Sequence, residues 1–219
     1  MEFDIIVATA HHIRYAPVIS AMIKEASEKR GTGIATRTPE YIATRLNSGK
    51  AIIALHGDQV VGFCYIETWG HQKFVANSGL IVDEQYRHHG LALKIKQKAF
   101  DLSRKMYPEA KLFGITTSLP VMKINSTLGY KPVTFSELTD DEEFWKGCQG
   151  CKNHDILIRN ERKMCLCTGM MYEPKAAEAI QAVPKKKRWE RFAEFLKERA
   201  NRVKKVNLPN YEQESSTGL

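Results

Sequence analysis

Short apolar runs alternate along the chain with longer segments whose apolar residues recur three or four positions apart. The runs at residues 3–8, 51–55, 60–66, 74–82, 112–117 and 130–135 predict strands, and the turn at 56–59 predicts a hairpin of the second and third. Helical spacing predicts helices at residues 11–30, 38–47, 91–106 and 121–128. The order β-α-α-β-β-β-α-β-α-β indicates an α/β protein.

The turn between the fourth predicted strand and the third predicted helix carries the most informative motif, Arg87-x-x-Gly90-x-Ala92. Backbone N–H groups at such a helix start, with the positive end of the helix dipole, bind anions, above all a pyrophosphate. Gly90 and Ala92 leave the backbone accessible, and Gly90 also tolerates a positive φ. The alternative is a surface turn whose glycine only eases the strand into the helix.

With this motif the chain resembles the GNAT superfamily of acyl-CoA N-acyltransferases over roughly residues 3–135. Val82, Arg87, Gly90 and Ala92 match the family signature V-x-P-x-x-R-x-x-G-x-G/A, and Glu84 replaces its proline. The resemblance implies an α/β (α+β) GNAT fold, with a mixed, mostly antiparallel sheet flanked by helices. It also implies acetyl-CoA or another acyl-CoA as co-substrate.

The same resemblance places coenzyme A around the turn. Main-chain amides of the loop would hold the pyrophosphate, and strand backbone would pair with the pantetheine arm and polarise the thioester carbonyl. The expected coenzyme A-binding residues are Ile81, Val82, Arg87, His88, His89, Gly90, Leu91, Ala92 and Asn125.

Acyl transfer needs a neutral amine, and Glu67, at the end of the third predicted strand, is the first candidate for its base. A solvated carboxylate at a strand end is the alternative interpretation. His71 and the pair His11-His12 are further candidates because histidine titrates near neutrality, although a loop histidine is usually only exposed.

The departing thiolate needs an acid, for which many relatives carry a tyrosine four residues before the glycine of a G-F/Y pair. Here that pair is Gly129-Tyr130, and Asn125 occupies the tyrosine position. A carboxamide gives up no proton at neutral pH, so Asn125 would only hydrogen-bond the sulfur or the pantetheine. Tyr130 or solvent is left as the acid, with core packing as the other role for Tyr130.

Several cations have two interpretations each. Lys94, Lys96 and Lys98 follow the phosphate loop and would either reach the 3′-phosphate of coenzyme A or form a solvated helix face. Arg14, Arg37 and Arg45 would either bind a carboxylate of the acceptor or lie on the surface.

Four cysteines form a C-x-x-C pair, Cys148 and Cys151, and a C-x-C pair, Cys165 and Cys167. Predicted strands at 156–158 and 164–171, with a turn at 160–162, would join the pairs in a β-hairpin and supply a structural zinc site, with His154 as a substitute ligand. Free thiols are an equal alternative and a disulfide a third. Because the segments around these cysteines look similar to a bacterial GNAT subgroup associated with arginine biosynthesis, glutamate or a related amino acid is the suggested acceptor.

The last part of the chain is basic: residues 174–219 hold 11 Lys and Arg against 6 Asp and Glu, and so supply +5 of the net charge of +8. Trp189, Phe192, Leu196, Ala200 and Val203 share one helical face, which predicts an amphipathic helix docked on the core or on a second copy in a homodimer. The run 185–188 would alternatively contact nucleic acid or an anionic surface.

We therefore predict a GNAT core at 1–136, a Cys-rich β-hairpin extension at 137–173 that completes or abuts the sheet, a basic helical tail at 174–209 and disorder at 210–219. Neither a run of 18 apolar residues nor a secretory leader is found, so a cytoplasmic protein without membrane partners is expected.

The predicted function is transfer of an acyl group, most simply acetyl, to the primary amine of a small molecule. The alternative is a catalytically degenerate acyl-CoA sensor, or a zinc-bearing adaptor that contacts nucleic acid through its tail.

Overall fold

The computed structural model describes residues 1–31, 33–175, 189–190 and 192–198. Residues up to 175 belong to one compact unit, which contains the sheet, and the pieces after 188 belong to a second. No helix within these described ranges is long and apolar enough to cross a membrane.

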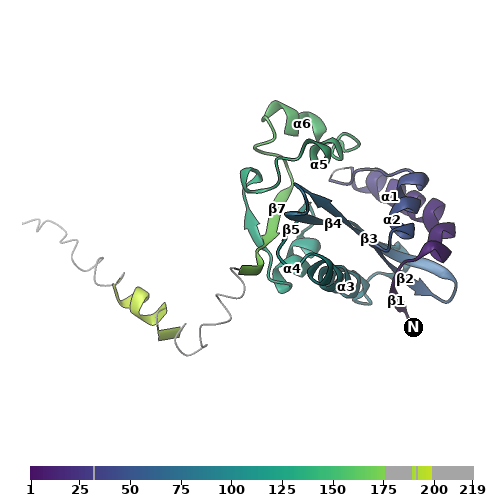
Figure 1. Cartoon of the computed structure of the whole chain (residues 1–219), viewed down its shortest axis with the longest axis horizontal. Helices are drawn as coiled ribbons and strands as arrows, with labels where there is room; N and C mark the ends of the chain where they lie inside the picture. The colour runs from purple at the N-terminus through teal and green to yellow at the C-terminus, as the bar shows by residue number, and fades with distance from the viewer. Residues whose placement is uncertain (32, 176–188, 191, 199–219) are drawn as a thin grey trace, which may run out of the picture. The chain divides into compact units, whose positions relative to one another are not determined.

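A seven-stranded sheet forms the centre of the first unit, with the order β1-β2-β3-β4-β5-β7-β6 (Figure 1). The strands are β1 (Asp4–Val7), β2 (Ala51–His56), β3 (Gln59–Trp69), β4 (Phe74–Val82), β5 (Lys111–Thr116), β6 (Lys131–Val133) and β7 (Thr168–Tyr172). Neighbours are antiparallel except β4 and β5, which are parallel. The predicted mixed, mostly antiparallel GNAT sheet is confirmed.

Helices cover both faces of this sheet. They are α1 (Ala16–Arg30), α2 (Pro39–Asn47), α3 (Leu91–Met106), α4 (Leu119–Thr127), α5 (Glu142–Lys146) and α6 (His154–Arg159), with short 3₁₀ turns at Ala10–Tyr15, Glu84–Tyr86 and Phe135–Glu137. In Figure 1, α1 and α2 lie on one face, and α3 and α4 on the other. The alternating side chains of β2 and β3 serve both layers: Ile53 and Phe63 pack toward α1 and α2, whereas Ile52 and Cys64 pack toward α3.

The predicted helix at 11–30 is divided in the structure. Residues Ala10–Tyr15 form a 3₁₀ turn, and the α-helix starts at Ala16, with Pro17 near its first position. Proline lacks a backbone N–H and is therefore best tolerated at a helix start, which explains why the regular helix begins here.

The predicted Cys-containing β-hairpin is wrong in its first strand. Residues 156–158 lie within the helix α6, where Asp155 pairs with Arg159 and the Asn160 side chain donates to the Ile156 carbonyl. Leu157 is buried while Ile158 is half exposed, the one-sided burial of a helix turn rather than the two-sided burial of a core strand. The second strand is confirmed only from Thr168, and as β7 it completes the sheet between β5 and β6.

The tail is described in part. Residues 189–190 and 192–198 are helical, and the rings of Trp189 and Phe192 lie 5.7 Å apart between centroids, tilted by 41°. The basic run at 185–188, the positions Ala200 and Val203, and residues 210–219 lie outside the described residues, so the predictions made for them stay predictions.

Candidate active site

The loop between β4 and α3 has the geometry of an anion site. Gly90, at φ +71°, caps α3 in the left-handed conformation, and His88 adopts φ +68° two residues earlier. The first three amides of α3, from Leu91 to Leu93, lack acceptors within the helix and point out of its start. Because a Cβ added at Gly90 would meet no atom within 4 Å, its conformation, not crowding, requires the glycine.

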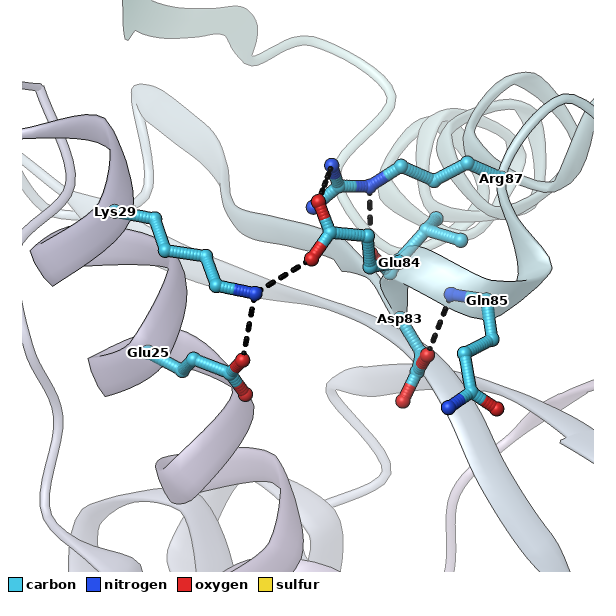
Figure 2. A network of polar contacts seen from close by, with 7 residues as sticks. Glu25, Lys29, Asp83, Glu84, Gln85 and Arg87 are labelled. Carbon is cyan, nitrogen blue, oxygen red and sulfur yellow. Dashed lines mark hydrogen bonds and ion pairs between the residues drawn. The ribbon is translucent and has the colours of Figure 1, made fainter.

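An ion-pair network fixes this loop to α1 (Figure 2). Glu84, which replaces the signature proline, accepts from Lys29 at 2.6 Å and from Arg87 at 3.2 Å, and Glu25 also contacts Lys29 at 2.9 Å. The ammonium of Lys29 lowers the pKa of the Glu84 carboxyl. The Arg87 guanidinium is thus turned toward Glu84 and the Val82 carbonyl, which leaves the loop's amides as the groups available to an anion.

Next to the loop, β4 and β5 separate. Their parallel pairing runs from Phe74–Lys111 to Ala76–Phe113, and beyond it β5 pairs with β7 alone. The free edge of β4 from Asn77 onward therefore offers backbone groups to a ligand, which fits the predicted role of Ile81 and Val82.

A cavity of about 760 Å³ occupies this split. Its walls come from β4 and β5, from α2 and the segment before it, from α3 and α4, and from the Cys-rich segment. Of the predicted site residues, it brings together Glu67, Ile81, Asn125, Arg37, Arg45, Lys96 and the four clustered cysteines. Its size is that of a small-molecule site.

Glu67 lies in the wall of this cavity and is buried, so the interpretation as a solvated strand end is wrong. Its carboxylate forms an ion pair with Arg45 and accepts a hydrogen bond of 2.6 Å from the Tyr41 hydroxyl. Burial, with the adjoining Glu67 carboxylate, raises the pKa of Tyr41. Tyr41 and Arg45 are one turn apart on α2, so a single helix face orients the carboxylate.

Arg37 reaches the same cavity from the segment before α2. Its guanidinium donates to the Tyr65 hydroxyl at 3.2 Å and to the Gly147 carbonyl at 3.3 Å, and it lies 5.3 Å from the centroid of the Tyr41 ring. Arg14 instead pairs with Asp58 and with the Tyr15 hydroxyl on an exposed surface away from the cavity. Two of the three predicted carboxylate-binding arginines are therefore brought together.

Asn125 is fully buried in the cavity wall. Its amide nitrogen contacts the Met170 sulfur at 3.7 Å, while its side-chain oxygen has no hydrogen-bond partner among the described residues. Tyr130 packs behind the wall and donates to the Asn77 side chain at 3.0 Å, and burial raises its pKa. Because Tyr130 does not line the cavity, its position favours the core-packing interpretation.

The histidine candidates for the base do not reach the cavity. His71 is exposed at φ +54°, and the His12 ring lies 2.9 Å from the Thr9 amide at the start of the chain's first 3₁₀ turn. Of the three lysines, Lys94 is exposed, Lys98 donates to the Ile5 carbonyl, and Lys96 is buried under the sheet. Lys96 therefore cannot be the exposed contact to a 3′-phosphate that was predicted.

The four cysteines of the extension are partly buried free thiols around the Arg37 end of the cavity. Burial and neighbouring thiols raise the pKa of Cys148 to about 11 and that of Cys167 to about 12. Structural zinc needs four converging thiolates or imidazoles. Among the described residues no group of three or more Cys, His, Asp or Glu could hold a metal ion, so the predicted zinc site is not supported.

Sequence reasoning missed Tyr41 and misjudged Lys96. Tyr41 stands four residues before Arg45 in a predicted helix, a spacing that would have placed both on one face. Lys96 is one residue after Ile95 of the apolar stripe of α3, so its burial departs from the pattern of that helix.

Comparisons with known proteins agree with this geometry. Residues 20–118 match the Acetyltransferase (GNAT) family. N-acetylglutamate synthase from Neisseria gonorrhoeae, solved with coenzyme A and N-acetyl-glutamate, is similar at a TM-score of 0.57 and 17% identity over 79% of this chain, which spans 35% of that protein's length.

Two shorter proteins are covered almost completely. Rv2747 from Mycobacterium tuberculosis, solved with coenzyme A, has a TM-score of 0.57 and 14% identity, with 78% of this chain and 98% of that chain covered. Diaminobutyrate acetyltransferase from Paenibacillus lautus, solved with its substrate and coenzyme A, has a TM-score of 0.54 and 9% identity, with 79% and 95% covered. A search of curated protein sequences finds no match.

At these identities the structural likeness speaks for the fold, and the family match speaks for the chemistry. Residues 20–118 therefore carry a domain that matches the Acetyltransferase (GNAT) family, and the fold of the described unit agrees with that match.

Proposed function

We propose that the protein acetylates the primary amine of a small acidic amino acid, of which glutamate is the simplest candidate. The observation that carries this proposal is the ion pair of a buried carboxylate, Glu67, with Arg45, and the presence of a second arginine, Arg37, in the wall of the same cavity at the β4–β5 split. An amino acid carries the complementary charges, an ammonium and carboxylates.

In this proposal coenzyme A is bound by the amides of the loop at Gly90 and by the free edge of β4. Glu67 takes a proton from the acceptor ammonium, directly or through water, while Arg45 and Tyr41 hold its carboxylate in place. Arg37 binds a carboxylate of the acceptor. Holding amine and thioester together in one cavity supplies a large part of the rate enhancement.

The structural relatives support an amino acid acceptor. The N-acetylglutamate synthase structure holds N-acetyl-glutamate beside coenzyme A, and the diaminobutyrate acetyltransferase structure holds L-2,4-diaminobutyric acid. The likeness to an arginine-biosynthesis subgroup points the same way, toward glutamate. These relatives share little sequence with this chain, so the arginines of the cavity are the more direct support for an acidic acceptor.

A thiol-release assay tests the proposal. Acetyl-CoA and succinyl-CoA are each offered with glutamate, glutamine, ornithine and spermidine, and glutamate with acetyl-CoA is expected to give the highest kcat/KM. Loss of a charge-assisted hydrogen bond costs roughly 1.5–3 kcal/mol, so Arg37→Ala should raise the KM for glutamate about 10- to 100-fold. Arg14→Ala, an exposed arginine away from the cavity, is the matched control and should change nothing. A polyamine as the best acceptor would contradict the proposal.

One observation favours a second function, an acyl-CoA sensor. Asn125 occupies the position of the tyrosine acid of many relatives, and Tyr130 lies outside the cavity lining. A protein that binds coenzyme A tightly but releases no thiol with any acceptor in the panel would be such a sensor.

A further inference from the structure

Lys96 is a lysine almost without solvent exposure, 2%, in the wall of the cavity. It stands in the second turn of α3, on the side that packs against the sheet. A buried ammonium loses its hydration, and its contacts must compensate for that loss if it is to stay charged. The groups that contact the Lys96 ammonium therefore determine whether it stays charged.

The surroundings of Lys96 contain hydrogen-bond acceptors and an aromatic ring but no carboxylate. Its Nζ donates to the Asn77 carbonyl at 3.0 Å and lies 5.6 Å from the centroid of the Tyr130 ring. Cys64, from β3, is the other titratable group that acts on it. Within the described part of the chain, no Asp or Glu comes within ion-pair distance of Nζ, so one ammonium proton has a carbonyl partner and none has an anionic one.

The carbonyl that Lys96 contacts marks the apex of the β4–β5 split. Asn77 is the first residue of β4 beyond the pairing with β5. Its carbonyl oxygen faces Gly114 of β5 and would lie 3.8 Å from a Cβ added at that glycine. The ammonium thus lies where the two strands part, at the inner end of the edge available to a pantetheine arm.

A second buried polar group lines the same cavity. The Asn125 side-chain oxygen, on α4, has no partner among the described residues, although the residue is 1% exposed. An unsatisfied buried acceptor is costly and indicates a ligand that donates a hydrogen bond there. The cavity wall therefore offers both a cationic donor and a free acceptor.

We propose that Lys96 is the acid that protonates the sulfur of coenzyme A during acyl transfer. The acceptor nitrogen attacks the thioester carbon and a C–N bond forms. The C–S bond then breaks, its electron pair stays on sulfur, and the Lys96 ammonium transfers a proton to that sulfur to give the coenzyme A thiol. The attacking nitrogen, now positively charged, loses its second proton through water to the neutral amine of Lys96, and the first proton, which Glu67 removed, passes to solvent.

Two further facts agree with this role. Burial lowers the pKa of Lys96, which makes its ammonium a stronger acid than that of an exposed lysine. Tyr130 donates its hydroxyl proton to Asn77 rather than toward the cavity. The proposal rests on acyl transfer in this cavity but not on the identity of the acceptor.

The test measures the thiol of bound coenzyme A and needs no acceptor. The thiolate absorbance of the coenzyme A complex is titrated against pH, with the desulfo-coenzyme A complex subtracted to remove the protein's own cysteines. A neighbouring ammonium stabilises the thiolate, so we expect the thiol pKa to be at least one unit lower in the wild-type complex than in free coenzyme A. Lys96→Met should abolish this lowering and reduce kcat about 100-fold or more. Lys105→Met, an exposed lysine in the last turn of the same helix, should leave both unchanged.

Lys96→Arg separates charge from proton transfer. Arginine keeps the positive charge but does not deprotonate, so the thiol pKa should stay low while kcat falls. If Lys96→Met still binds coenzyme A and the thiol pKa in its complex is as low as in the wild-type complex, the proposal is wrong, even if glutamate is a good acceptor.

If Lys96→Met does not fold, lysine ¹³Cε NMR of the wild-type protein tests the proposal instead. Replacing desulfo-coenzyme A with coenzyme A should raise the titration midpoint of the Lys96 signal, and an unchanged midpoint overturns the proposal.

Discussion

The proposed coenzyme A site has a phosphate end at the β4–α3 loop and an acceptor end in the cavity at the β4–β5 split, and the two ends are built in different ways. At the phosphate end, a continuous stretch from β4 to α3 provides the binding groups from its own backbone, and its side chains, such as those of His88 and His89, are exposed. At the acceptor end, the groups come from α2 and the segment before it, from β3 and from the Cys-rich segment. They meet across more than a hundred residues of sequence, as the hydrogen bond from the Arg37 guanidinium to the Gly147 carbonyl shows.

Because of this difference, the two ends depend on different properties of their residues. The phosphate end requires a particular backbone conformation, so residues that set φ or fill space are expected to matter most there. The acceptor end requires particular charges, and each depends on its neighbours, since Glu67 has both Arg45 and Tyr41 as partners. Substitutions should therefore affect coenzyme A binding at one end and turnover at the other.

The largest effect is expected at Glu67. Glu67→Gln keeps the shape of the side chain but removes the base, so kcat/KM for the acceptor should fall about 10²- to 10⁴-fold while the Kd of coenzyme A changes little. Steady-state kinetics and calorimetry measure the two quantities. Glu28→Gln, an exposed glutamate on α1, is the control. Activity within threefold of wild type would remove Glu67 from the mechanism.

The next largest effect is expected at Gly90. A non-glycine residue at φ +71° costs roughly 1–3 kcal/mol, and a carboxylate there also repels the pyrophosphate, so Gly90→Glu should weaken coenzyme A binding about 10- to 100-fold. Gly90→Ala adds the conformational cost without the negative charge, so it should weaken coenzyme A binding less than Gly90→Glu.

Gly57 offers a matched control for this glycine. It has φ +56° in the β2–β3 turn, and a Cβ there likewise meets nothing within 4 Å. Gly57→Ala should lower the melting temperature as Gly90→Ala does but leave the Kd of coenzyme A unchanged. An equal loss of affinity in both variants would show that general destabilisation, not the loop, explains the effect.

The same difference decides what the sequence could predict. The loop from Val82 to Ala92 was predicted with its helix because the strand, the turn and the helix are adjacent in sequence. The partners of Glu67 and the burial of Lys96 depend on which elements pack together. The prediction of 156–158 as a strand failed because Ile-Leu-Ile has high β-propensity, whereas the local bonds from Asp155 to Arg159 and from Asn160 to Ile156 form a helix.

A third prediction concerns the cysteines of the acceptor end. With pKa values of about 11 and about 12, Cys148 and Cys167 hold far less thiolate at pH 7.5 than a free cysteine at about 8.5. Alkylation by iodoacetamide, followed site by site by mass spectrometry, should be at least about tenfold slower than that of a free cysteine in a short peptide. The rate should keep rising from pH 8 to 10. A free cysteine is largely ionised by about pH 9.5, so a rate that levels off at that pH would mean ordinary thiols and a more open cavity end.

The smallest effect is expected from Glu84, the one residue of the loop signature that departs from the family. Its carboxylate occupies Arg87 and Lys29, both next to the phosphate site, so Glu84→Gln frees two cations and removes an anion (Figure 2). Coenzyme A should then bind about two- to threefold more tightly at low salt, and the gain should vanish at 0.5 M salt because exposed charges are screened. Glu25→Gln, which leaves both contacts of Glu84 in place, should show no gain. Weaker binding by Glu84→Gln at every salt concentration would instead mean that the ion pairs hold the amides of the loop in their binding conformation, and that even the phosphate end, which binds through its backbone, depends on specific side chains.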